Sequence, residues 1–307
     1  MRRLFKPSII AICVAVFGLF VGIQITKAQN SGIQISPVDY QFEINPGESQ
    51  SGKLTVTNND KVALDYMIEI ELFSQISENG APSFAGTTKT EGITSLADWI
   101  EIAEADKNGE IAATGKKEIE FLINVPKSAE PGGHYAAVFV KQITKDEQGK
   151  TQLGVSSRVG LLVLVSVPGN VEKTGEIISF DYPKFVWSGP IDLEMRVKNT
   201  GTVHYDSIVK ADFKPMLGKI QSAELGKHTI LPDNIRYYKD SWHNKYPFGY
   251  YRIMATATDG NGDEMTVEGG LWAIPLIIVI PVLIGTILLW LLLHYIKSNF
   301  QLVKKDK

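Results

Sequence analysis

Residues 191–199 read Ile-Asp-Leu-Glu-Met-Arg-Val-Lys-Asn, and their apolar and charged side chains alternate at every position up to Lys198. Successive side chains of an extended strand point to opposite faces of a sheet. The four apolar side chains therefore share one face, and charged side chains of both signs share the other. The stretch predicts a strand with one face in a core and one in water, ended by Asn199-Thr200-Gly201.

The same two-residue period recurs along the chain. Residues 38–44 alternate before Asn45-Pro46-Gly47 turns the chain, and residues 64–72 place an apolar face opposite an acidic one. Further strands are predicted in the segments 54–56, 119–125, 135–140, 159–167, 209–213 and 251–257. No amphipathic helix of three turns is recognisable between the terminal segments, so the predicted fold class is all-β.

One polar stretch, residues 74–95, interrupts the strands. It is long for a plain loop, which favours an insertion or a binding surface. Ser95-Leu96-Ala97-Asp98 at its end matches a capping box and predicts one short helical turn. Trp99 and Ile102 are then expected to resume the strand pattern.

Two domains are predicted, because the segments between the chain ends hold roughly 240 residues. We place them at 29–168 and 169–270, as two tandem immunoglobulin-like β-sandwiches. Two signatures repeat: residues 56–60 match 197–201, and Pro131-Gly132-Gly133-His134-Tyr135 matches Pro247-Phe248-Gly249-Tyr250-Tyr251. Tyr135 and Tyr251 are candidates for the tyrosine corner, in which a hydroxyl bonds to nearby backbone. The alternative is that both are ordinary strand tyrosines.

The C-terminal region contains a predicted transmembrane helix, residues 271–296. Residues 272–295 hold no acidic side chain, lysine or arginine, and as a helix they would be roughly 36 Å long, enough to cross a bilayer. Trp272, Trp290 and Tyr295 stand where aromatic rings can lie at headgroup level. The basic tail, 297–307, is predicted to be cytoplasmic. The alternative is a buried helix of a soluble domain.

The N-terminus resembles a leader. Basic residues precede an apolar run from Ile9 to Ile25, and small residues follow, which predicts a signal peptide over 1–28 cleaved between Ala28 and Gln29. An uncleaved anchor is the alternative. In either case the two sandwiches are expected outside the cell membrane. The one cysteine, Cys13, lies in the leader, so the mature chain forms no disulfide.

Reaction chemistry is not apparent in the sequence. The exported histidines are scattered, and we predict no catalytic residues, no cofactor and no metal site. Residues 259–263 begin like a calcium loop but lack its later glycine and glutamate, so a hairpin turn is predicted. Tyr237, Tyr238 and Trp242 are a candidate binding surface, the alternative being that they fill one end of a core. A net charge of −3 does not favour binding to nucleic acid.

The order of parts resembles a known family. The chain begins with a leader and ends with one span and a lysine tail. Between them lie a first β-domain with Asn45-Pro46-Gly47-Glu48 and a second with Leu231-Pro232-Asp233-Asn234 ahead of Trp242. This order looks like that of the WxL-interacting surface proteins of Gram-positive bacteria. Residues 78–84 and 131–133 stand where that family has an asparagine-glycine segment and a glycine pair. The resemblance implies a peptidoglycan-binding first domain, a partner-binding second domain and assembly with secreted WxL proteins.

Three functions follow as hypotheses. The first is a non-enzymatic, membrane-anchored bacterial surface protein that attaches to cell-wall peptidoglycan or a secreted surface protein, by loops or by strand addition at a sheet edge. The second is a structural spacer or scaffold subunit of a membrane-associated assembly. The third, a glycan hydrolase, has the least support because no catalytic constellation is recognisable.

Overall fold

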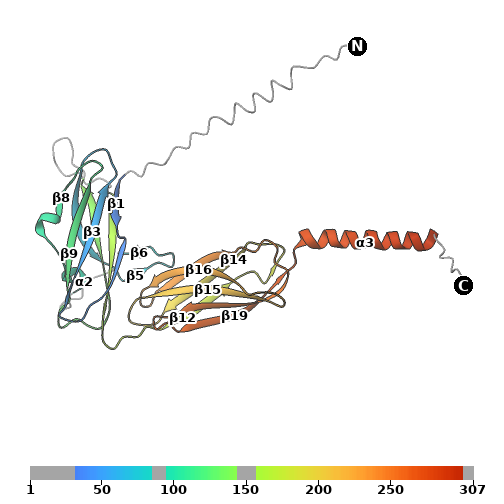
Figure 1. The fold of residues 1–307 in the computed structure, drawn as a ribbon. Helices are drawn as coiled ribbons and strands as arrows, with labels where there is room; N and C mark the ends of the chain where they lie inside the picture. Colours follow the sequence, from blue (N-terminus) through green and yellow to red (C-terminus); the bar gives the residue numbers. More distant parts are fainter. Residues whose placement is uncertain (1–31, 85–94, 144–156, 300–307) are drawn as a thin grey trace, which may run out of the picture.

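A computed structural model describes residues 32–84, 95–143 and 157–299. Two β-sandwiches follow each other, and a long helix, α3 (Leu276–Asn299), leaves the far end of the second (Figure 1). The predicted all-β class, with two sandwiches and one C-terminal apolar helix, is confirmed. The predicted leader, with Ala28 and Gln29, and most of the basic tail lie outside the described residues.

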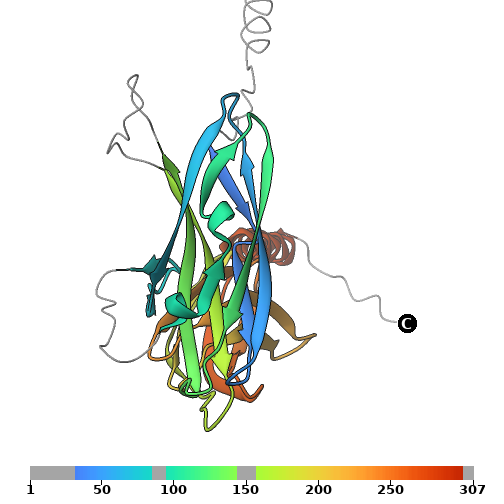
Figure 2. The same ribbon diagram turned by 90° about the vertical axis from the view of Figure 1, so that its left-hand side faces the viewer.

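The first sandwich has one sheet of order β1-β3-β9-β7 and one of order β2-β11-β10-β4-β8. Figure 2 shows this sandwich nearest the viewer. The pairing of β2 with β11 is parallel, whereas the other pairs are antiparallel. The strands are β1 (Ile33–Ser36), β2 (Asp39–Glu43), β3 (Ser49–Asn58), β4 (Leu64–Leu72), β7 (Ile100–Ile102), β8 (Asn108–Ile111), β9 (Lys116–Asn124), β10 (Gly132–Ile143) and β11 (Arg158–Val167).

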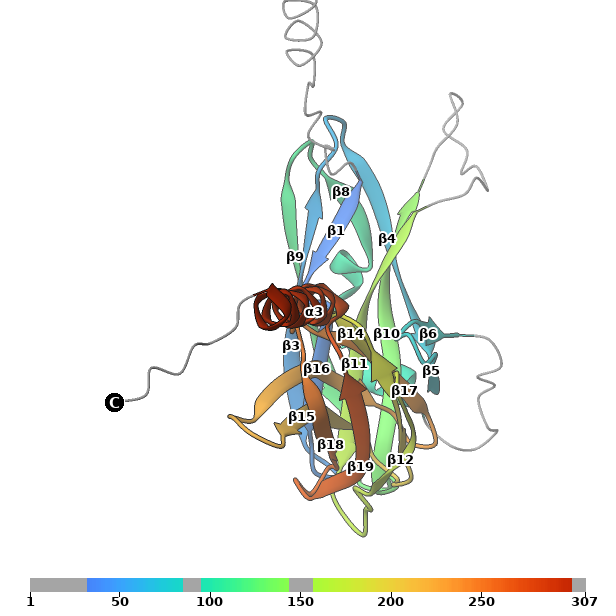
Figure 3. The same ribbon diagram turned by 90° about the vertical axis from the view of Figure 1, so that its right-hand side faces the viewer.

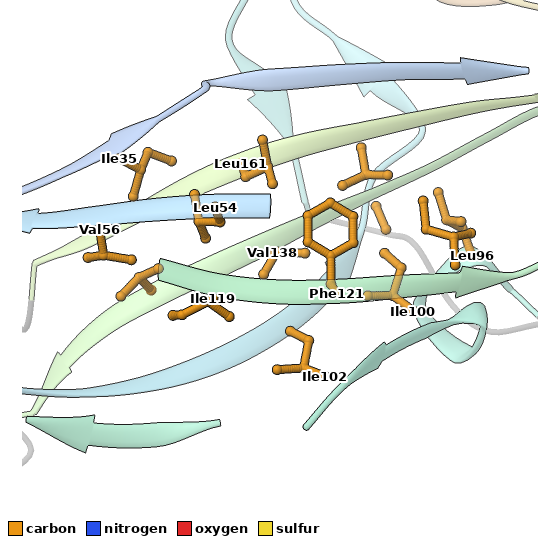
Figure 4. Close-up of a cluster of buried hydrophobic side chains, with 14 of the residues drawn as sticks. Ile35, Leu54, Val56, Leu96, Ile100, Ile102, Ile119, Phe121, Val138 and Leu161 are labelled. Carbon is orange, nitrogen blue, oxygen red and sulfur yellow. The ribbon is translucent and has the colours of Figure 1, made fainter. Parts of the chain in front are cut away.

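Alternate side chains of these strands fill the space between the two sheets (Figure 4). Leu54, Val56 and Ile119 come from one sheet and Val138 and Leu161 from the other, and each is at most 1% exposed. Burial of one such side chain stabilises the fold by about 1.5–3 kcal/mol. The two-residue period therefore identifies the core face of these strands.

The polar stretch between β4 and β7 contains a small hairpin and a helical turn. The hairpin pairs β5 (Gln75–Ile76) with β6 (Pro82–Ser83), and the turn is α2 (Leu96–Trp99). The Asp98 carboxylate accepts hydrogen bonds from the Ser95 N–H at 3.0 Å and from its hydroxyl at 2.7 Å, so the predicted helical turn is confirmed. Trp99 belongs to this turn and not to a strand, which corrects its assignment. A 3-10 turn, η1 (Glu104–Asp106), follows β7.

The second sandwich pairs a sheet of order β12-β14-β17 with one of order β13-β19-β18-β15-β16. Its strands are β12 (Gly175–Asp181), β13 (Phe185–Val186), β14 (Ile191–Asn199), β15 (Tyr205–Pro215), β16 (Gln221–Ile230), β17 (Ile235–Trp242), β18 (Gly249–Thr258) and β19 (Glu264–Ala273). The four apolar side chains of β14 are at most 1% exposed, so the predicted core face of residues 191–199 is confirmed. The period did not reveal β16 and β17, because their apolar residues do not alternate regularly.

The repeated strand-end signature has one structural role in both sandwiches. Asn58 and Asn199 are completely buried. Each donates from Nδ2 to the carbonyl oxygen four residues later and to a carbonyl ending another strand, at 2.8 and 3.2 Å for Asn58 and at 2.9 Å twice for Asn199. Each Oδ1 accepts from the N–H two residues later, at 2.9 and 2.8 Å. The signature is therefore a buried corner present once in each domain.

Helix α3 begins later than the predicted start at 271. β19 continues to Ala273, and the Trp272 N–H donates to the Lys184 carbonyl at 2.9 Å, which holds Trp272 in the sandwich. The apolar helix therefore starts at Leu276, and Trp272 is a strand residue. Its length and composition allow it to cross a membrane.

Candidate functional site

Strand β10 is buried on both faces, and its second face leads to the candidate site. Val138 and Val140 face the first core, whereas Tyr135, Ala137 and Phe139 point to the opposite side of the sheet. There they form a separate apolar cluster with Phe73, Leu164 and Leu231, the last of which comes from the second domain. The apolar outer face of β10 is thus covered by Phe73, by Ile76 and Phe84 of the hairpin segment and by Leu231 of the second domain.

Backbone and side-chain hydrogen bonds join the two domains next to this cluster. The Gly133 N–H donates to the Thr202 carbonyl at 3.1 Å, and the Tyr135 hydroxyl accepts from the His204 N–H at 3.1 Å. Burial raises the pKa of Tyr135 well above its ordinary value. The predicted tyrosine corner is therefore wrong for Tyr135, because its hydroxyl reaches the other domain instead of nearby backbone. Only glycine fits at position 133, because a Cβ there would collide with this hydroxyl.

The β5–β6 hairpin spans from the first domain to the second, beside β10 and β17 (Figure 3). The Ile76 N–H donates to Asn234 Oδ1 at 2.9 Å, and the Tyr237 N–H donates to the Glu78 carbonyl at 2.9 Å. The Glu78 carboxylate accepts from Arg196 Nε at 2.9 Å. The segment 74–95, for which an insertion or a binding surface is predicted, therefore contacts the second domain in its described part.

A cleft of about 440 Å³ lies between the hairpin, the outer face of the first domain and strands β16 and β17. Its floor comes from the first domain and the hairpin and is apolar apart from Asp39, whereas its far wall is polar and comes from the second domain. The lining side chains include Ile76, Phe84, Phe139, Leu162 and Leu164 on the apolar side and Lys227, His228, Thr229 and Arg236 on the polar side. A concave apolar surface with a few polar groups is the usual form of a binding site.

The floor of the cleft is shaped by a glycine. Gly160 lies opposite Phe139 in the β10–β11 register, and a Cβ at Gly160 would come within 2.6 Å of the Phe139 ring. The Phe139 ring contacts the Phe84 ring edge-on, with centroids 4.9 Å apart. The Arg158 guanidinium lies 4.2 Å from the Phe139 centroid. Gly160 therefore leaves the room that the ring occupies.

Arg236 is one of the charged residues that line the cleft, together with Lys227 on the same wall and Asp39 on the side of the first domain. Its Nε is buried and has no hydrogen-bond partner among the described residues, and burial lowers its pKa. Its guanidinium packs on Gly80, where a Cβ would collide with it. His228 lines the same wall, and burial followed by the charge of Arg236 lowers its pKa. A half-buried cation whose Nε has no hydrogen-bond partner among the described residues attracts an anionic group, so the cleft suits a ligand that combines apolar groups with a carboxylate or similar anion.

The neighbouring wall is held by a small polar network. Asp206 accepts from Lys227 at 2.8 Å and from the Thr229 hydroxyl at 2.6 Å. Gln41 of the first domain donates to Asp206 at 3.3 Å and to the Thr229 hydroxyl at 3.0 Å. Burial raises the pKa of Asp206, but these hydrogen bonds outweigh it, and the net pKa lies below its ordinary value. Lys227 is thus neutralised by Asp206.

His204 is buried at the domain junction. Its ring centroid lies 5.5 Å from that of Tyr135, and its Nδ1 has no hydrogen-bond partner among the described residues. Burial lowers the pKa of His204 to about 4. The neutral ring is therefore part of the apolar interface between the domains.

The candidate surface of Tyr237, Tyr238 and Trp242 is not formed, because two of its members are in the second core. Tyr238 is 0% exposed and Trp242 is 3% exposed, and Trp242 stacks on Phe213 with centroids 3.9 Å apart. Tyr237 is half-buried beneath Arg196. These rings fill the core, which is the alternative that the sequence left open.

Tyr251 makes a hydrogen bond of the kind expected at a tyrosine corner. Its hydroxyl accepts from the N–H of Phe248, three residues earlier, at 3.3 Å.

The predicted turn at 259–263 is confirmed, with Asp259 Oδ1 accepting two backbone N–H bonds at 2.9 Å. Within the described segments, no three His, Cys, Asp or Glu side chains gather in a way that could hold a metal ion.

Of the residues that line the cleft, only those of the segment 74–95 were singled out from sequence, and the strand residues were missed. Arg236 and Phe139 belong to different domains and different strands, and no local spacing links them. One signal was available, since the odd positions of 135–139 are apolar on a strand whose even positions already face a core.

No protein-family model and no curated protein matches the chain. Among solved structures, the class 5 fimbriae chaperone CfaA is 13% identical and aligns over 78% of this chain and 99% of its own, with a TM-score of 0.36. The periplasmic chaperone SfaE is 13% identical over 80% and 100%, with a TM-score of 0.35. A PapD-like domain of human CEP192 is 12% identical over 55% and 95%, with a TM-score of 0.30. Since these scores are below 0.5, the fold assignment rests on the strand pairing.

Proposed function

We propose that this chain is a non-enzymatic, membrane-anchored surface protein that binds an extracellular partner in the cleft between its two sandwiches. The observation that carries the proposal is the apolar floor of the cleft facing Arg236, whose Nε has no partner among the described residues. The apolar helix α3 supports the anchor. The predicted leader and basic tail support an orientation with the sandwiches outside and the tail in the cytoplasm.

The partner that fits the cleft is a protein segment with apolar side chains next to an acidic group. Apolar side chains would cover Phe139 and Leu162, and a carboxylate would accept hydrogen bonds from Arg236. A secreted surface protein is therefore the first candidate, which agrees with the family resemblance of the sequence. Peptidoglycan is the second partner that the resemblance implies, through the first domain.

A spacer or scaffold role is favoured by a separate observation, the bonded junction between the domains. Hydrogen bonds from Gly133, Ile76 and Tyr237 cross it, together with the Arg196–Glu78 ion pair. Such a junction holds the two sandwiches in one arrangement. A scaffold of this kind would contact its neighbours through other surfaces and would not need the cleft.

The test is selection of a displayed random peptide library on the full chain in lipid nanodiscs. We expect enriched peptides to share apolar residues around an Asp or Glu. Arg236→Gln should weaken their binding about 10- to 100-fold, since a hydrogen bond to a charged group contributes about 1.5–3 kcal/mol. Arg252→Gln is the matched control, because Arg252 is an exposed arginine of β18 whose ion pair with Glu268 is 3.8 Å long.

Sedimentation with washed peptidoglycan is the parallel measurement. Equal peptide binding by wild type and Arg236→Gln would contradict the cleft as the binding site. Peptidoglycan binding that both variants retain would assign wall attachment to another surface of the first domain. Release of soluble sugars from the wall polymer would contradict the non-enzymatic proposal.

A further inference from the structure

The end of the second sandwich from which α3 leaves carries a concentration of exposed apolar side chains. Three loops meet there: 182–190, 214–220 and 243–248. The strand register brings them together, because Pro215 pairs with Tyr251, and Trp272 pairs with both Tyr250 and Phe185. We call this surface the α3-proximal end.

It gathers several highly exposed apolar side chains, including the two most exposed of the described residues. Leu217 is 91% exposed, Met216 79%, Phe248 68% and Ile220 58%. Among the described residues that precede α3, every exposed large aromatic side chain lies at this end. Contiguous exposed apolar surface of this kind usually marks an interaction site.

The charge of the three loops has one sign. They contain four lysines, at positions 184, 214, 219 and 245, and no aspartate or glutamate. A surface that combines apolar side chains with lysines is complementary to an anionic bilayer, because the rings and aliphatic chains enter the interface while the ammonium groups contact headgroups.

The connection between the sandwich and α3 has almost no free length. The Ile274 N–H donates to the Val186 carbonyl at 3.0 Å, and the Pro275 carbonyl accepts the first helical hydrogen bond, from Ile278, at 2.9 Å. Every residue of the connection is thus bonded to the sandwich or to the helix. If α3 spans the bilayer from Leu276, the loops must lie at the membrane surface (Figure 1).

We propose that the α3-proximal end docks on the lipid bilayer, with Met216, Leu217, Ile220 and Phe248 inserted at the interface and the four lysines over anionic headgroups. This inference rests on the membrane anchor of the proposed function. Docking fixes the second sandwich against the membrane surface, so the interdomain cleft is held at a set height and orientation above the bilayer.

The test places an environment-sensitive fluorophore on the full chain reconstituted in vesicles of phosphatidylcholine with phosphatidylglycerol. Leu217→Cys carries the probe in a Cys13→Ser background, and Val62→Cys is the control, since Val62 is an exposed apolar residue of the first domain at 69% exposure. We expect a blue-shifted emission at position 217 that nitroxide-labelled lipid quenches, and a water-like, unquenched emission at position 62. Lys219→Gln should lower the docked-to-undocked ratio about fivefold in these vesicles and leave it unchanged in pure phosphatidylcholine.

Carbonate extraction separates the two ways in which the idea can fail. A chain that resists extraction but whose probe at 217 behaves like the one at 62 overturns docking and leaves the anchor intact. A chain that carbonate releases overturns the anchor, and docking with it. Both labelled positions are exposed, so neither change disturbs a core.

Discussion

Acidification should weaken the junction between the two domains, because His204 is buried there as a neutral ring. Burial lowers its pKa from 6.5 to about 4, the Asp206 charge opposes this and the Lys173 charge adds to it. The unfolded chain therefore binds a proton on this histidine at a pH where the folded chain does not. The histidine's contribution to stability is complete above about pH 6.5 and is lost as the pH falls toward 4.

The expected loss is about 2 kcal/mol at pH 5 and about 3 kcal/mol at pH 4, since each pKa unit corresponds to about 1.4 kcal/mol. His204→Phe is the reference, because it keeps an aromatic ring against Tyr135 and does not titrate. For a domain of this size, 2 kcal/mol corresponds to a melting-temperature change of about 10 °C. The assay is thermal unfolding of the full chain in micelles at several pH values, for the wild type and this variant.

Both proteins lose the contributions of their carboxylates, so only the difference between them reports on His204. The melting temperature of the wild type should fall further than that of His204→Phe, by about 10 °C between pH 7 and 5. Parallel melting curves over this range would refute the assignment of a neutral, buried His204 at the junction.

Three substitutions test other parts of the structure. Asn199→Ala should lower the free energy of unfolding by about 3 kcal/mol, because it leaves buried backbone groups without partners. Denaturant unfolding measures this change, and a decrease below about 1 kcal/mol would contradict the buried corner. Trp242→Ala should lower the free energy of unfolding by about 3–5 kcal/mol in the same measurement, because it leaves a cavity beside Phe213. An unchanged denaturation midpoint would contradict the core position of Trp242. Gly133→Ala should displace the Tyr135 hydroxyl at a cost of about 1–3 kcal/mol, seen as faster hydrogen exchange of the amide at position 204.

The fold could be predicted from sequence where one strand face was buried and the other solvated. Strand β14 is such a case, and its alternation identified the core side chains directly. Strand β17 is not, because Tyr237 and Tyr238 are adjacent aromatics of which only Tyr238 enters the core. The start of α3 was misplaced because Trp272 is as apolar as the helix that follows, and only its pairing in β19 separates it.

The candidate site was beyond sequence reasoning for a different reason. The cleft exists because strands of the second domain stand opposite the outer face of the first, and the contact of Tyr135 with His204 joins residues 69 positions apart. The sequence did single out Tyr135, as a tyrosine-corner candidate, and residues 74–95, as an insertion or a binding surface. It placed the tyrosine bond within one domain, since the repeated Pro-x-Gly-x-Tyr signature suggested equal roles for Tyr135 and Tyr251.

The central claim, that an extracellular partner binds in the interdomain cleft, is tested most directly by photocrosslinking in intact cells. A photoreactive residue replaces Leu162 on the cleft floor or, as a control, Ile178, an exposed residue of β12. We predict an adduct from position 162 that Arg236→Gln reduces at least tenfold, and none from position 178. An adduct from 178 alone, or one from 162 that is unaffected by Arg236→Gln, would contradict the account.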